Sequence, residues 1–337
     1  MGTHPIHPGY AGIPTFFQAP YGDLDSVREG MTVVAGVPID QGIITAKPGA
    51  RFGPRAIREA SQMPRGVLAG NVEQTWVDVD TGVALRLKDH LDLVDVGDFD
   101  IDPTDIMKTT WSVVAGVEAI VKRGGRPVVL GGDHYIAYPC FEGFVRGMSE
   151  RKESLRVGYL HVDTHSDFRF DYGPLGKYNH ATSARRVSEN RAASYRNMAW
   201  LGLNGSVLDA EMYRTFKRER LKMVTARMIR ERGPVAAVKE VMETVASGVD
   251  AVYLTVDIDV VNGSEARGTG APVFAGIEAR AFLEMMEVLS TYDIIRSIDL
   301  CEVAPGLDPS GTTADLAVAG LLAVLERRLF DRVDPGA

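Results

Sequence analysis

The stretch RVGYLHVDTHSDF, residues 156–168, joins an apolar run to a group of polar side chains that can bind cations. Residues 156–163 are rich in apolar and β-branched side chains, which predicts a strand buried on both faces. Asp163, His165 and Asp167 follow at alternate positions, and side chains two apart on a strand point to one side. Unpaired, they would cost roughly several kcal/mol at the edge of a core, so a compensating charge is expected there.

Similar apolar runs alternate with segments of helical spacing along the chain. The other expected strands are 31–40, 91–99, 126–132, 198–205, 250–260 and 294–303, and the expected helices are 54–61, 105–125, 234–248, 277–292 and 315–330. Pro54 and Pro234 suit a first helical turn, whereas Gly124 and Gly248 suit a C-terminal cap. The alternation predicts an α/β fold of three layers, with a mostly parallel sheet between helices on both faces.

Composition restricts the organisation of the chain and its partners. No linker divides the 337 residues, so we expect an irregular N-terminal arm over residues 1–30 and a single catalytic domain over residues 31–337. The formal net charge of −8 argues against nucleic acid or an anionic membrane as partner and favours a small substrate. The N-terminus lacks signal-peptide features and no apolar run is long enough to span a membrane, which favours a cytoplasmic location. Cys140 and Cys301 are expected to be core thiols.

Potential metal ligands follow four of the expected strands. They are His134 in LGGDH, then Asp163, His165 and Asp167, then Asp257 and Asp259 in TVDID, and Glu302 in IDLCE. The carboxyl ends of parallel strands form the usual functional edge of such a sheet. Two histidines and four aspartates supply nitrogen and oxygen donors for two divalent cations, Mn(II) or Ni(II), with Co(II) or Fe(II) as alternatives. The charges balance as well, because four carboxylates carry about −4 and two cations +4.

The chain resembles the ureohydrolase family, which includes arginase and agmatinase. The resemblance lies in PGARFGPRAIREAS (48–61), GGDH, HVDTHSD, TVDID and EVAPGLDPSGTTADLA (302–317), and YAGIPTFF (10–17) is more similar to the agmatinase and guanidinobutyrase branch. It implies an arginase/deacetylase-like fold and hydrolysis of a guanidino compound to urea and an amine. Ligands to two metal ions would be His134, Asp163, His165, Asp167, Asp257 and Asp259.

The resemblance also implies roles for three residues. Asp167 would orient the attacking water and pass its proton to the leaving amine, and Glu302 would pair with the substrate guanidinium. His180, in YNHATS, matches the family's proton-shuttling histidine, and the alternative is a surface-loop histidine. His161 is expected to be a packed core histidine that faces away from Asp163.

Several loops depart from the family pattern. Residues 261–270 read VNGSEARGTG, residues 180–183 read HATS, and Asn204 stands where the family commonly has Arg. With the aromatics Phe168, Phe170, Tyr172 and Tyr178 in one loop, this predicts a small, alkylated or uncharged guanidine, or a biguanide such as metformin, as substrate. Tyr172 and Asn204 are thus candidate substrate contacts, although neutral drift of the loops and packing of the rings under the loop are alternatives.

Two functional classes remain open besides a disfavoured single-zinc deacetylase-like enzyme. The first is an active dinuclear hydrolase, and the second is a catalytically weak metal-binding subunit that assembles with an active paralogue. Retention of all six ligand types favours the enzyme. The resemblance further implies a homo-oligomer, either a trimer or a hexamer.

Overall fold

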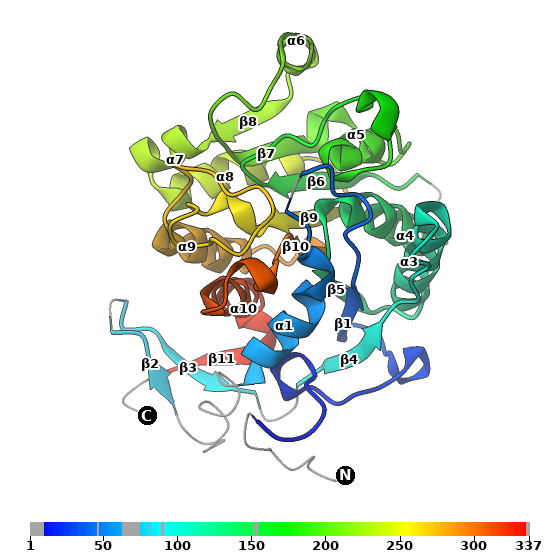
Figure 1. Cartoon of the computed structure of the whole chain (residues 1–337). Coiled ribbons are helices and arrows are strands. Elements are labelled where there is room, and N and C mark those ends of the chain that lie inside the picture. Colours follow the sequence, from blue (N-terminus) through cyan, green and yellow to red (C-terminus); the bar gives the residue numbers. More distant parts are fainter. Residues whose placement is uncertain are drawn as a thin grey trace.

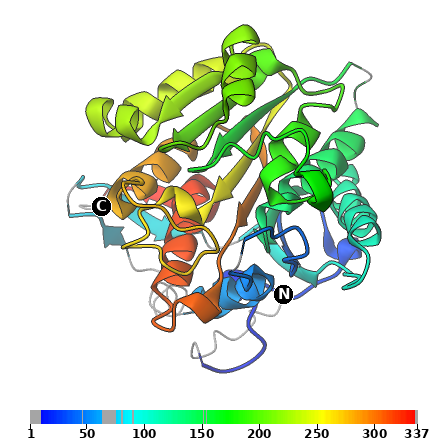
Figure 2. The ribbon, with the colours of Figure 1, turned by 45° about the horizontal axis from the view of Figure 1, so that its top comes forward.

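The computed structural model describes residues 10–45, 47–62, 75–79, 81–88, 91–150, 152 and 154–334. Eight parallel strands form one sheet in the order β4-β1-β5-β10-β9-β6-β7-β8 (Figures 1 and 2). Their bounds are β1 Thr32–Val37, β4 Leu93–Asp98, β5 Arg126–Gly131, β6 Val157–Val162, β7 Met198–Leu203, β8 Lys222–Thr225, β9 Ala251–Asp257 and β10 Ile295–Cys301. The predicted parallel sheet is confirmed.

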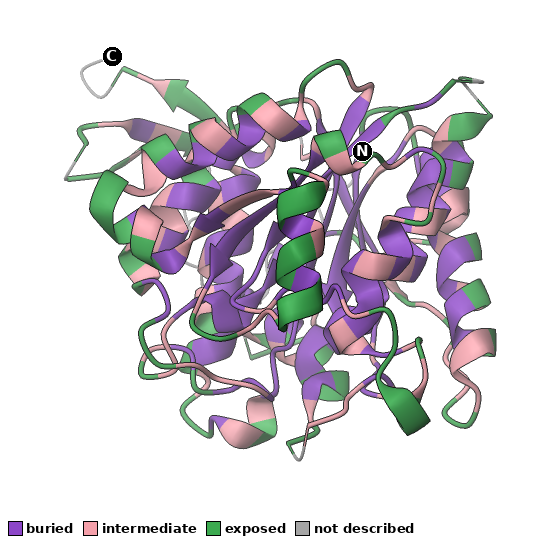
Figure 3. Ribbon diagram, turned by 90° about the horizontal axis from the view of Figure 1, so that it is seen from above, coloured by how far each residue is buried: buried purple, intermediate pink, exposed green. Residues whose placement is uncertain are grey.

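Helices cover both faces of the sheet, and Figure 3 shows the buried strands between them. One face packs against α3 (Ile106–Lys122), α4 (Ala137–Ser149), α5 (Ser183–Val187) and α6 (Ala210–Arg218). The other packs against α1 (Gly53–Ala60), α7 (Ala226–Arg232), α8 (Pro234–Val245), α9 (Ala279–Leu289) and α10 (Thr312–Val324). Successive residues of a strand point to opposite faces of the sheet. In β9, Val252 and Leu254 face the helices α1 and α7–α10, whereas Tyr253 faces the helices α3–α6.

The structure adds elements that the sequence did not predict. Helix α4 contains Pro139, Gly143 and Gly147, which weaken its helical pattern. A side-chain carbon on Gly143 would lie 2.5 Å from the carbonyl oxygen of Val114, so this glycine permits the close approach of α3. Strand β8 is also new, as is a small antiparallel sheet of β2 (Trp76–Val77), β3 (Ala84–Leu87) and β11 (Phe330–Val333).

Predicted helix ends agree in part with the structure. Gly124 and Gly248 have φ angles of 84° and 65°, in the left-handed region expected of helix caps. Pro54 and Pro234 lie in the first turns of α1 and α8. The single helix expected over 315–330 is wrong, because α10 ends at Val324, α11 spans Glu326–Leu329, and Phe330 begins β11.

Part of the expected N-terminal arm packs into the core. Phe16 and Phe17 are fully buried, and the backbone N–H of Phe16 donates to Asp95 in β4 over 2.7 Å. Asp95 also binds Arg58 of α1, so this segment is tied to the sheet and to a helix. The division of the chain at residue 30 stays a prediction. Among the described helices, none combines the length and apolarity needed to span a bilayer.

Candidate metal centre

The predicted ligands meet at one edge of the sheet. Strands β5, β10, β9 and β6 are neighbours in that order, and each leads directly into part of the polar cluster. His134 follows β5, Glu302 follows β10, Asp257 ends β9, and Asp163 follows β6. Residues more than a hundred positions apart in sequence therefore lie close together, because the carboxyl ends of parallel strands share one edge.

Four donor atoms form the first group. Nδ1 of His134 lies 3.0 Å from Oδ2 of Asp163, 3.1 Å from Oδ2 of Asp167 and 3.3 Å from Oδ2 of Asp257. Exposure of these four residues ranges from 0% to 8%, so water hardly solvates them. Three carboxylates therefore converge on a single imidazole nitrogen.

The second group shares Asp163 with the first. Nδ1 of His165 lies 3.0 Å from Oδ2 of Asp259 and 3.6 Å from Oδ1 of Asp163. Asp163 thus presents one oxygen to each group, and it is held in this orientation by the backbone N–H of His165, which donates to Oδ1 over 2.5 Å. A carboxylate placed in this way can bridge two cations.

The spacing of the donor atoms fits two divalent cations. Ligand distances of about 2.0–2.2 Å in an octahedral site put neighbouring donors about 2.9–3.1 Å apart, close to what the first group shows. Moreover, Nδ1 of His134, Oδ2 of Asp163 and Oδ1 of Asp259 are buried without a hydrogen-bond partner among the described residues. Buried polar atoms need partners, and cations would provide them.

Protonation reflects the crowding of these carboxylates. Burial, reinforced by the charges of Asp259 and Asp163, raises the pKa of Asp257 well above its usual value. Burial also raises the pKa of Asp259 to about 7, even though His165 opposes this. Without cations the cluster therefore retains protons near neutral pH, and binding of cations would release them.

His161 does not occupy the place that the sequence analysis expected. It is fully buried, but its Nε2 lies 2.9 Å from Oδ2 of Asp163, and its ring stacks on that of His134 with centroids 4.7 Å apart. The expectation that it faces away from Asp163 is wrong, because residues two apart on a strand share a side. The hydroxyl of Tyr159, two residues before His161 and on the same side of the strand, lies 3.0 Å from Nδ1 of His161.

Glu302 and His180 lie together beside the cluster. Oε1 of Glu302 accepts the backbone N–H of His134 over 2.9 Å and lies 3.2 Å from Nδ1 of His180. The backbone N–H of Ile44 points at Nε2 of His180 over 3.3 Å, which is a hydrogen bond only while the imidazole is neutral and carries its proton on Nδ1, toward Glu302. In the imidazolium both nitrogens are donors, and this contact is lost. Burial opposes protonation of His180, but the bond to Glu302 and the charges of Glu302, Asp167 and Asp133 together outweigh it and raise the pKa to about 9.

Backbone conformation marks two residues of the site. Asp167 and Glu302 have φ angles of 46° and 67°. This left-handed backbone conformation is rare for residues other than glycine. Such conformations cost on the order of 1–3 kcal/mol each and persist where the surroundings enforce them, often at functional sites. The sequence carried no signal for this strain.

The remaining candidates contact residues outside the cluster. The side-chain amide of Asn204 donates to the carbonyl of Phe274 over 2.8 Å, and Tyr172 is partly exposed beneath Arg169. Phe168 is buried against Trp200, and Tyr178 stacks on Tyr138. Substrate contacts by Asn204 and Tyr172 stay predictions.

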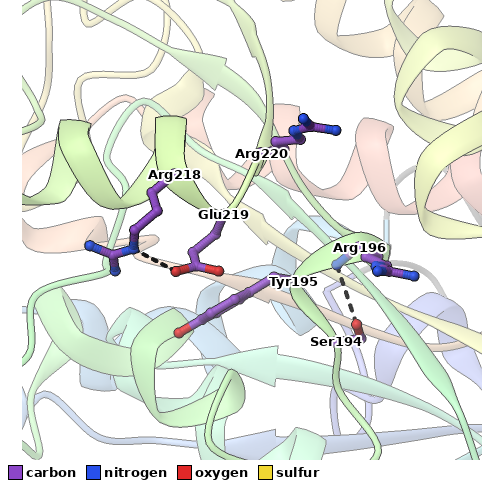
Figure 4. A pocket seen from close by; sticks show the side chains of 6 residues that line it. All are labelled: Ser194, Tyr195, Arg196, Arg218, Glu219 and Arg220. Carbon is purple, nitrogen blue, oxygen red and sulfur yellow. Dashed lines mark hydrogen bonds and ion pairs between the residues drawn. The ribbon is translucent and has the colours of Figure 1, made fainter.

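A separate surface pocket of about 660 Å³ contains none of the cluster residues (Figure 4). It is lined by Ser194, Tyr195, Arg196, Arg218, Glu219 and Arg220. Arg218 is bound to Glu219, and the side chains of Arg196 and Arg220 do not converge on a common point with it (Figure 4). We assign no role to this pocket.

Comparison with known proteins relates the whole chain to one family. A family model described as the arginase family matches residues 31–325. Human mitochondrial guanidino acid hydrolase is 31% identical over 93% of this chain and 84% of its own, and mitochondrial agmatinase of Gallus gallus is 32% identical over 90% and 82%. The structure of proclavaminate amidinohydrolase from Streptomyces clavuligerus superposes with a TM-score of 0.78 at 29% identity, covering 96% of this chain and 99% of that one.

Proposed function

Because the chain belongs to the arginase family, we propose that it hydrolyses a guanidino compound to urea and an amine with the help of two divalent cations. The observation that carries the proposal is the convergence of three buried carboxylate oxygens on Nδ1 of His134, beside a second group that shares Asp163. Relatives named as guanidino acid hydrolase, guanidinobutyrase and agmatinase support the substrate class.

The cations would be held by His134, Asp163, His165, Asp167, Asp257 and Asp259. When bound, a pair of divalent cations lowers the pKa of water and so supplies a nucleophile near neutral pH. Mn(II) and Ni(II) both suit a set of nitrogen and oxygen donors. Reconstitution with each ion in turn would distinguish Mn(II) from Ni(II).

The other residues bind the substrate and move protons. Glu302 pairs with the guanidinium through a charge-assisted contact and fixes its carbon near the cluster. Asp167 accepts the proton of the attacking water and returns it to the leaving amine. His180, protonated on Nδ1 against Glu302, supplies a second proton path toward the amine.

We further propose a small or uncharged substituent on the guanidine, as the altered loops 180–183 and 261–270 suggest. Asn204, which has no charge, stands where the family commonly has Arg, and one N–H of its amide is bound to the carbonyl of Phe274. Guanidine, methylguanidines and biguanides such as metformin are the compounds that this proposal favours.

A guanidino acid is the second candidate. The carbonyl oxygen of Lys47 lies near Gly270 and Glu302, and the exposed Lys47 ammonium has no ion-pair partner in the described part of the chain. We propose that this ammonium pairs with the carboxylate at the far end of a guanidino acid. An ammonium, as in agmatine, would be repelled.

A panel assay tests these alternatives. The protein is reconstituted with Mn(II) or Ni(II) and offered guanidine, methylguanidines, metformin, 4-guanidinobutyrate, agmatine and arginine, and urea is measured for each. A tenfold lead of 4-guanidinobutyrate or agmatine in kcat/KM, about 1.4 kcal/mol of preferential transition-state binding, would contradict a small substrate. If no compound yields urea, a metal-binding subunit of a mixed oligomer becomes the better hypothesis. Sedimentation would at the same time test the proposed trimer or hexamer.

A further inference from the structure

Two stretches, residues 40–45 and 47–51, are fastened beside Glu302 at several points. The backbone N–H of Gly42 donates to Asp133 over 2.8 Å, and the carbonyl of Gly42 accepts the backbone N–H of His180 over 3.0 Å. Farther along, Asp40 accepts hydrogen bonds from the backbone N–H of Gly49 and from the side chain of Arg51. The two stretches therefore form a fixed wall of the site.

Three oxygen atoms from this wall and from Glu302 converge next to Gly270. A side-chain carbon on Gly270 would lie 3.1 Å from the carbonyl oxygen of Lys47, 3.5 Å from Oε2 of Glu302 and 3.5 Å from Oγ1 of Thr45. All three oxygens therefore lie within 3.5 Å of one point beside Gly270, and each of them can accept a hydrogen bond.

Two of these oxygens have capacity to spare. Oγ1 of Thr45 is buried and has no hydrogen-bond partner among the described residues. The hydrogen bonds that Glu302 accepts from His134 and His180 both fall on Oε1, which leaves Oε2 directed at the same point. Buried polar atoms without partners are uncommon and indicate a missing partner. A group with two N–H donors would satisfy both oxygens, since the hydroxyl of Thr45 can accept as well as donate.

From this geometry we propose that Thr45 is a substrate-binding residue, which together with Oε2 of Glu302 and the carbonyl of Lys47 receives one NH₂ group of the guanidinium. An NH₂ group is close to a methyl group in size, carries two N–H donors, and shares the positive charge that a carboxylate attracts. We take this nitrogen to be unsubstituted, because only then does it offer two N–H groups to these oxygens. It stays in the urea, while the substituted nitrogen leaves with the amine.

This inference deepens the proposed function and rests on it. The decisive variants are Thr45→Val, which keeps the shape and removes the hydroxyl, and Thr45→Ser, which restores it. Gly270→Ala places a carbon at the point near all three oxygens, and Gly306→Ala is the matched control, since no atom lies within 4 Å of the added carbon and its backbone angle is ordinary.

The measurements are the dissociation constant of the guanidinium ion by calorimetry, KM and kcat for the best substrate of the panel, and the metal content. We expect Thr45→Val to raise the dissociation constant and KM about tenfold with both metal ions retained, the effect of one lost hydrogen bond to a charged group. Thr45→Ser should stay within about twofold of the wild type, and Gly270→Ala should weaken binding more than Thr45→Val does.

The outcomes separate the two proposals. Equal guanidinium binding by the wild type and Thr45→Val overturns the role of Thr45, whether or not urea is formed. Loss of metal from Thr45→Val also overturns it, since the residue would then support the cluster. Tight, Thr45-dependent binding of guanidinium without urea from any compound supports the binding role and contradicts the hydrolase. A wild type that neither binds guanidinium nor forms urea overturns both.

Discussion

Nε2 of His134 lies 2.8 Å from Oγ1 of Thr255, so the ring nitrogen away from the carboxylate cluster is bound within the sheet. Thr255 in turn donates to Asp299 over 2.5 Å, and Asp299 also accepts from Tyr253 and from Cys301. Three donors point at Asp299, so Asp299 acts as an acceptor. Because the hydroxyl of Thr255 donates to Asp299, it must accept from His134, and Nε2 of His134 therefore carries a proton. The lone pair of Nδ1 is thereby left for a cation.

The first prediction concerns this Thr255 contact. Thr255→Val removes the acceptor for Nε2–H, frees the ring to rotate, and should weaken metal binding at the His134 centre by about 10–100-fold. Thr255→Ser, which keeps the hydroxyl, should bind both ions like the wild type. Competition with a chromogenic chelator measures the affinities. Unchanged affinity in Thr255→Val would show that packing alone positions His134.

The second prediction separates the two metal positions. His165→Ala should lose mainly one ion, because His165 contacts only Asp163 and Asp259 within the cluster. Asp163→Ala should disturb both, because each oxygen of Asp163 faces a different group. Metal content per chain, measured by elemental analysis after dialysis, reports both effects. A fully reconstituted wild type that holds one ion or fewer per chain would contradict the dinuclear site.

The third prediction isolates recognition of the substrate. Glu302→Gln keeps an oxygen that can accept the N–H of His134 but removes the negative charge. We expect metal content to stay at the wild-type level, while kcat/KM falls at least about a hundredfold, or roughly 2.7 kcal/mol of transition-state binding. Steady-state kinetics and elemental analysis on the same preparation check this. Metal loss in this variant would place Glu302 among the ligands.

The fourth prediction concerns pH and His180 in the metal-free protein. Its pKa rises from the usual 6.5 to about 9 on folding, so protonation stabilises the fold. This contribution is complete below pH 6.5 and is lost as the pH rises through about 9. It amounts to on the order of 3 kcal/mol.

Denaturant unfolding between pH 6 and 10 measures the effect. The free energy of unfolding of the wild type should decrease over this range more steeply than that of His180→Gln, which has no ionisable group at this position. Parallel curves for the two proteins would mean that His180 does not hold its proton against Glu302.

The sequence by itself determined the sheet and the polar residues that gather at its edge. Continuous apolar runs predict strands buried on both faces, and the i, i+2 spacing of Asp163 with His165 and of Asp257 with Asp259 directs each pair to one side, so both features follow from local geometry. The same spacing rule, applied correctly, also brings His161 to the side of Asp163. Helix α4 escaped prediction because Pro139, Gly143 and Gly147 act against a helical pattern that packing against α3 overrides.

Only the tertiary structure decided which distant residues complete the site. The strand order β5-β10-β9-β6 brings His134 to Thr255 and Glu302 to His180, across 121 and 122 positions of sequence. Thr45 belongs to no motif that the sequence analysis identified. Its hydroxyl became a candidate for binding only because the structure buries it near Glu302 and Gly270. Periodicity records which way a side chain points from its own strand or helix, whereas contacts between elements depend on how the whole chain packs, and no local pattern encodes that.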